Sequence, residues 1–127
     1  MNIITHQAIN PELCGTALDV GKNTSRVELR TSQNMSVDDS GLVHGGFIFG
    51  LADYAAMIAV NHPHVVLGGA NVKFIKPVVA GELVTAEAEV IQSEGKKQMV
   101  QVSVNRKDDV VFKGEFTCFV LDKHVLA

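Results

Sequence analysis

The chain has 127 residues, of which 46% are hydrophobic and 20% are charged, and its formal net charge is −3 at pH 7. This length suffices for one buried core and leaves no room for a second, so we expect a single domain over residues 1–127. The composition excludes a disordered chain. The acidic balance argues against a nucleic-acid partner, because nucleic-acid binders present a basic surface.

The cysteines and the apolar segments indicate in which compartment the protein works. Cys14 and Cys118 have neither CxxC spacing nor metal-binding neighbours, so we expect reduced thiols and a cytoplasmic protein. No segment has the basic, apolar and small-residue order of a signal peptide. The longest apolar run, residues 45–60, contains Asp53 and is shorter than the roughly 20 residues that a membrane-spanning helix needs. We therefore expect no membrane partner.

The first predicted strands lie near the N-terminus. Residues 25–31 alternate, with Val27 and Leu29 on one face and charged side chains on the other, which is the pattern of a half-buried strand. Residues 14–20 show a weaker form of the same pattern and predict a strand before it.

The next predicted element is a helix over residues 45–60. The segment reads GGFIFGLADYAAMIAV and is apolar on every face. A helix of this kind is normally surrounded by protein on all sides. We therefore expect it to be the centre of the fold.

Four more strands are predicted in the second half of the chain. Apolar and polar residues alternate in four segments, residues 70–74, 84–90, 100–104 and 112–120. Turn-forming residues separate them at 77–81, 93–95 and 107–109. Short turns join antiparallel neighbours. Two strands, a buried helix and four strands together predict an α+β hotdog fold, in which an antiparallel sheet wraps around one central helix.

A glycine-rich turn over residues 41–46 leads directly into the predicted helix. The start of a helix has unpaired backbone N–H groups and a partial positive charge. Glycines let a ligand approach that backbone closely, so the turn can hold a carbonyl oxygen on which negative charge develops. The alternative is structural: Gly45 and Gly46 permit tight packing, and His44 caps the turn.

Asp53 is the only charged residue of the predicted helix. An unpaired buried carboxylate is costly, so proteins seldom keep one without a partner or a purpose. Such a carboxylate can act as general base on a water molecule or attack a carbonyl carbon itself. The alternative is a structural carboxylate bonded to the backbone of a turn.

The string HGGFIFGLADYAAMIAVN, residues 44–61, resembles the helix motif of the phenylacetate-pathway type of hotdog thioesterase, which is related to the 4-hydroxybenzoyl-CoA thioesterases. In that family a His-Gly-Gly turn precedes a catalytic Asp or Glu, and His44 and Asp53 keep the family's nine-residue spacing. The string FIKPVVAGE, residues 74–82, is similar to the strand and turn that follow the helix in these enzymes. The resemblance extends from about residue 24 to residue 120.

The resemblance implies a role for several residues. The Gly45 N–H forms the oxyanion site, His44 orients the turn, and Asp53 is the base or nucleophile. Two positions depart from the family: Asp38 replaces an Asn or Gln six residues before the His, and Met57 stands where many relatives carry a hydroxyl. An ionised Asp accepts hydrogen bonds but cannot donate them.

The substrate-binding residues expected besides these catalytic ones are Gly46, Asp38, Met57, Asn71 and Lys73. Lys73 can meet a CoA phosphate, although exposed lysines on strands usually serve solvation and edge protection. We expect no metal, because His62 and His64 lack carboxylate or thiolate neighbours, and no cofactor, since CoA is part of the substrate.

The predicted function is hydrolysis of an acyl-CoA with a small, medium or aromatic acyl group to the free acid and CoA. The alternatives are a non-catalytic acyl-CoA-binding hotdog module and, last, a hotdog dehydratase. Along a helix, Asp53 lies roughly 12 Å from the Gly45 N–H. Because that is too far for one reacting group, we expect a homodimer with shared active sites, or a dimer of such dimers.

Overall fold

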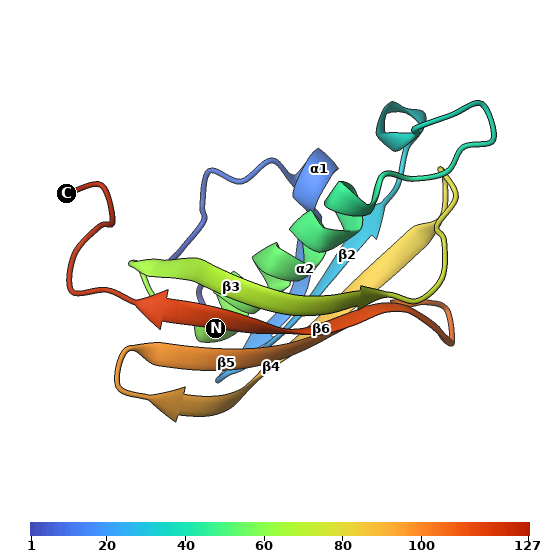
Figure 1. The fold of residues 1–127 in the computed structure, drawn as a ribbon. Coiled ribbons are helices and arrows are strands. Elements are labelled where there is room, and N and C mark those ends of the chain that lie inside the picture. The colour runs from blue at the N-terminus through green and yellow to red at the C-terminus, as the bar shows by residue number, and fades with distance from the viewer.

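The computed structural model describes residues 1–127 and consists of one six-stranded antiparallel sheet that wraps around one long helix (Figure 1). The sheet has the strand order β1-β2-β4-β5-β6-β3. The elements in chain order are α1 (Pro11–Cys14), β1 (Thr16–Gly21), β2 (Thr24–Arg30), the 3₁₀ helix η1 (Gln33–Met35), α2 (Gly45–Val60), β3 (Val65–Phe74), β4 (Leu83–Glu94), β5 (Lys97–Arg106) and β6 (Asp109–Val120). The predicted hotdog fold is confirmed.

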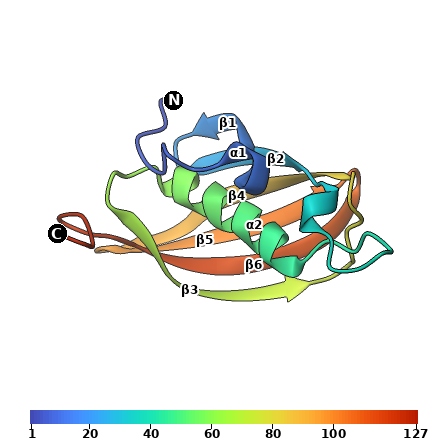
Figure 2. The same ribbon diagram turned by 90° about the horizontal axis from the view of Figure 1, so that it is seen from above.

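Helix α2 occupies the concave side of the sheet, as the turned view in Figure 2 shows. The predicted bounds of this helix are confirmed. It ends at Asn61, which adopts a left-handed conformation with φ 52° and donates its N–H to the carbonyl of Met57. The Asn61 side chain then holds the N-terminal segment, because its Oδ1 accepts from the N–H of Ile4 and its Nδ2 donates to the carbonyl of Asn2.

The strands bury one face against α2, as the alternation predicts. In the three central strands the inward side chains are buried; this set is Val84, Ala86, Ala88, Val100, Val102, Val104, Phe112, Phe116 and Cys118. At roughly 25 cal/mol per Å² of apolar surface, burial of this face is the main source of the sheet's stability. It also fixes the register, since a slip by one residue would expose every one of these side chains.

The predicted strand starts differ from the structure by one to five residues; the strands predicted from residues 100 and 112, for example, begin at Lys97 and Asp109. The strand predicted over residues 14–20 begins at Thr16, because Asn10 caps a helical turn there and Gly15 turns the chain with φ 101°. The strand predicted over residues 70–74 begins at Val65. Its first half lacks alternation because the register shifts between Leu67 and Gly69.

The two edges of the sheet differ. At the β1 edge the register shifts between Ala17 and Asp19, and the N-terminal amine donates to the carbonyl of Val20. Strand β3 forms the opposite edge (Figure 2); it is longer, and its residues 68–71 are exposed. Exposed edges of this length are the ones that pair with another chain. None of the helices combines the length and apolar character that a membrane crossing requires.

Candidate active site

The turn before α2 is organised by His44, which is the N-cap of the helix. Its Nδ1 accepts a hydrogen bond of 2.7 Å from the N–H of Gly46. A Cβ atom at position 46 would lie 2.7 Å from the same Nδ1, so the cap requires glycine there. The capping role considered for His44 is therefore observed. Because the Gly46 N–H is engaged, a substrate can use it only if the imidazole moves.

The Gly45 N–H is the free donor of this turn. It makes no hydrogen bond within the chain and lies at the positive end of α2. Gly45 borders a pocket of about 280 Å³ whose other walls are mostly apolar, among them Phe74 and Val78. Gly45 thus brings an unpaired backbone donor to the border of this pocket, and an oxyanion requires such a donor.

Asp53 lies two turns further along the helix and faces a second pocket, of about 410 Å³, which it shares with Met57. Its Oδ1 is fully buried without a hydrogen-bond partner, and no hydrogen bond to its other oxygen is formed within the chain. The alternative of a carboxylate bonded to a turn is thus not observed. Burial raises the pKa of Asp53 to about 6, so the carboxyl group is mostly ionised at pH 7.

Two thiols lie close enough to feel the charge of Asp53. Burial, and then the Asp53 carboxylate, raises the pKa of Cys118 to about 12 and raises that of Cys14 as well. Both cysteines are free and stay protonated near neutral pH. Neither cysteine borders the Asp53 pocket, and as protonated thiols they are not competing nucleophiles.

Four polar residues at the Asp53 pocket were missed by the sequence interpretation: Thr5, His6, His64 and His124. They come from the N-terminal segment, the loop after α2 and the C-terminal segment. Thr5 and His6 are bonded to each other, with 2.8 Å between Oγ1 and Nδ1. No spacing rule relates residues 5 and 53. The link exists because Asn61 holds the N-terminal segment beside the end of α2. No group of His, Cys, Asp and Glu side chains could hold a metal ion.

Asp38 belongs to the turn and not to the Asp53 pocket. Its Oδ1 accepts from the N–H groups of Ser40 and Leu42, at 3.0 and 3.2 Å. This exposed carboxylate therefore shapes the loop that leads to Gly45. An Asn could make the same two contacts, because its carbonyl oxygen is also an acceptor.

Asn71 and Lys73 lie on the face of β3 that points away from α2. They border a polar depression of about 630 Å³ on the outer side of the sheet, together with Lys113 and Glu115 of β6. Within one chain they are thus separated from the turn and from Asp53. A substrate contact for these two residues stays a prediction.

One antiparallel sheet around one apolar helix, with a free N–H at the helix start and a buried carboxylate in the same helix, defines a protein of the hotdog class. The model of the family described as the thioesterase superfamily matches residues 40–113, which include both features. The chain belongs to the thioesterase superfamily.

The individual relatives are described in different ways. The crystal structure of PH1136 from Pyrococcus horikoshii is 50% identical, has a TM-score of 0.99 and is matched over 100% of this chain and 98% of that one. A methylthioribose-1-phosphate isomerase of Aquifex aeolicus is 52% identical over 96% of this chain and 27% of its own length. The transcription factor FapR of Thermoanaerobacter sp. is 31% identical over 86% of this chain and 54% of its own. The chain thus spans only about a quarter to a half of these curated relatives.

Proposed function

We propose that this protein hydrolyses acyl-CoA thioesters, with Asp53 as the base or nucleophile and the Gly45 N–H as the donor to the carbonyl oxygen. The observation that carries the proposal is the half-buried Asp53 carboxylate, whose Oδ1 is buried without a hydrogen-bond partner and which borders a pocket. A fold alone does not define a reaction. A desolvated carboxylate without a structural partner has little use in a protein that only packs.

The two possible roles of Asp53 differ in what attacks the thioester carbon. As a base, the carboxylate removes a proton from water as the water attacks the thioester carbon; the C–S bond then breaks, and CoA leaves with that proton as its thiol. As a nucleophile, the carboxylate attacks that carbon itself, CoA leaves as the C–S bond breaks, and water then hydrolyses the resulting anhydride to the free acid and the carboxylate. A pKa of about 6 suits either role at neutral pH, since the group is mostly ionised but has lost the hydration of a surface carboxylate. In both cases negative charge moves onto the carbonyl oxygen, where a backbone N–H stabilises it.

The same geometry supports a homodimer with shared sites. Gly45 and Asp53 of one chain border different pockets, so one subunit alone does not place them around one carbon. The exposed edge of β3 offers a surface for a two-fold partner, whose own α2 would run antiparallel to the first. Each site would then combine Gly45 of one subunit with Asp53 of the other. The free cysteines fit the reduced, cytoplasmic setting that we expect.

The second candidate is a module that binds acyl-CoA without cleaving it. It is favoured by the similarity to FapR, a relative described as a transcription factor and not as an enzyme. The engaged Gly46 N–H and the lack of a hydroxyl at Met57 also leave the attacking water with fewer partners. The two candidates differ in whether the thioester breaks.

The experiment is a thiol-release assay with short, medium and aromatic acyl-CoAs, performed on the wild type and on Asp53→Asn. We expect turnover by the wild type on at least one substrate and a loss on the order of a hundredfold or more in the variant. Saturable binding of acyl-CoA without turnover by the wild type would support the binding module instead. Near-wild-type turnover by a folded Asp53→Asn protein would remove Asp53 from the mechanism.

A further inference from the structure

The loop before Gly45 is hydrogen-bonded to the connection between β3 and β4. The Val43 N–H donates to the Val78 carbonyl at 2.9 Å, and the Ala80 N–H donates to the Gly41 carbonyl at 2.8 Å. Apart from bonds among residues 33–47, these are the hydrogen bonds of the loop's backbone. The connection between β3 and β4, residues 75–82, therefore sets where the turn before α2 lies.

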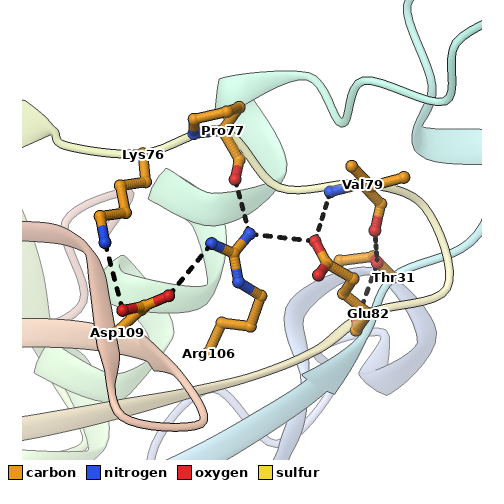
Figure 3. A network of polar contacts seen from close by, with 7 residues as sticks. All are labelled: Thr31, Lys76, Pro77, Val79, Glu82, Arg106 and Asp109. Atoms are coloured by element: carbon orange, nitrogen blue, oxygen red, sulfur yellow. Dashed lines mark hydrogen bonds and ion pairs between the residues drawn. The ribbon is translucent and has the colours of Figure 1, made fainter.

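Arg106, at the end of β5, is the centre of the contacts that hold this connection, as Figure 3 shows. The Arg106 guanidinium donates through Nη1 to the Pro77 carbonyl at 2.7 Å and to Glu82 Oε1 at 3.1 Å. The same Glu82 oxygen accepts from the Val79 N–H at 2.7 Å. Arg106 thus spans both ends of the connection and fixes its curvature around residues 78–80.

We call the contacts of Arg106 with Pro77 and Glu82 the Arg106 clamp; neighbouring side chains add further contacts to it. The Thr31 hydroxyl, at the end of β2, lies 2.8 Å from the Glu82 carbonyl and 3.2 Å from that of Val79. Lys76 pairs with Asp109 at 3.1 Å, and the other end of the Arg106 guanidinium lies 3.6 Å from the same carboxylate (Figure 3). These contacts join the connection to β5, to β6 and to the residue that follows β2.

Burial separates this clamp from an ordinary surface ion pair. The side chains of Arg106 and Glu82 are 21% and 34% exposed, whereas those of Arg26 and Asp19, an ion pair between β2 and β1, are 48% and 68% exposed. Exposed pairs contribute little, while partly buried charge-assisted bonds hold their geometry more firmly. Arg26 is therefore a matched control for Arg106, because it also pairs with a carboxylate but does not contact the connection between β3 and β4.

We propose that Arg106 is a positioning residue for the Gly45 N–H, acting through Pro77, Glu82 and the backbone bonds of residues 78–80 to residues 41–43. This inference rests on the proposed thioesterase function. An oxyanion donor must lie within a few tenths of an ångström of its ideal place, and misplacement by about 1 Å can cost a hundredfold in rate. Arg106 touches no substrate; it sets the position of the group that does.

The test compares Arg106→Met, which keeps the length of the side chain but removes its donors, with Arg26→Met. For each variant we measure kcat and KM in the thiol-release assay and hydrogen exchange of the Val43 amide. In Arg106→Met we expect kcat to fall on the order of tenfold, KM to change less than about twofold, and Val43 to exchange faster. We expect Arg26→Met to match the wild type in all three. Arg106→Lys, which keeps one cationic donor, should recover part of kcat.

The outcomes separate the two proposals. If the wild type cleaves no thioester, the proposed function fails, whatever the exchange data are. If the wild type is active and a folded Arg106→Met protein has wild-type kcat, the positioning role is wrong and the function stands. An equal fall of kcat in Arg26→Met would also overturn it, since a general loss of surface ion pairs would then be the cause. Should Arg106→Met fail to fold, Arg106→Lys and Glu82→Gln carry the same comparison.

Discussion

The two halves of helix α2 contribute to the candidate site in different ways. The first turn is partly exposed and contributes backbone: a free N–H at Gly45 and a second N–H that His44 caps. The second half is mostly buried and contributes one side chain, the Asp53 carboxylate, whose Oδ1 is buried and whose pKa is raised by desolvation. A backbone donor depends on where the chain lies, whereas a desolvated carboxylate depends on what surrounds it. The first half should thus be sensitive to position and the second to residue identity.

The largest effect that tests this contrast is complementation between two inactive variants. Gly45→Pro deletes the donor, and proline is well tolerated at the first position of a helix. His44 already has the ψ of 131° that a residue before proline prefers, and the Phe74 ring, 3.1 Å from an added Cβ, is exposed enough to shift. Asp53→Ala deletes the carboxylate. Alone, each variant should be inactive.

Refolded together in equal amounts, the two variants should recover roughly a quarter of wild-type activity in the thiol-release assay. About half of the dimers are then mixed, and each mixed dimer has one intact site of two. Each variant refolded alone is the control. If mass measurement finds mixed dimers and activity stays absent, the donor and the carboxylate serve the same subunit, and the shared-site geometry is wrong.

The sequence alone predicts the central helix and its single carboxylate. Residues 45–60 are apolar on every face, which indicates a central helix, and a single Asp in such a segment stands out without any alignment. The period of two in the later strands likewise predicts which faces are buried. These features depend on neighbours in the chain, so local patterns contain them.

The surroundings of Asp53 could not be predicted in this way. Thr5 and His6 reach its pocket because Asn61 binds the N-terminal segment, a contact across more than fifty positions. The Arg106 clamp depends on three separate strand ends meeting at the connection before β4. The start of β3 was missed because a bulge there breaks the alternation. Contacts between distant segments leave no periodic trace.

A second prediction, of intermediate size, concerns the buried half of the helix. Burial raises the pKa of Asp53 from 3.8 to about 6, so the folded state binds the proton more tightly than the unfolded state does. The stability that protonated Asp53 contributes is therefore fully present below about pH 4 and is lost as pH rises through about 6. After allowance for partial exposure, the loss is about 2 kcal/mol.

We expect the difference in unfolding free energy between Asp53→Asn and the wild type to grow by that amount, in favour of the variant, between pH 4 and pH 7.5. Urea titrations at four pH values and one fixed protein concentration measure it. Asp39→Asn, which changes an exposed carboxylate, is the control. The same pH dependence in both variants would mean that overall charge is the cause and that the burial of Asp53 is not.

The smallest expected effect concerns the first turn, where Gly46 and His44 depend on each other. A Cβ at position 46 would lie 2.7 Å from His44 Nδ1, so Gly46→Ala must expel the imidazole and lose the cap, at a cost of about 1 kcal/mol. The gain in helix propensity from Gly to Ala offsets most of that loss, so the single variant should have nearly wild-type stability. In a His44→Ala background no cap remains to be lost, and the same substitution should stabilise the protein. A double-mutant cycle of urea titrations should therefore give a coupling energy of about 1 kcal/mol. Additive effects would mean that the imidazole does not cap the helix in solution and that Gly46 is there for another reason.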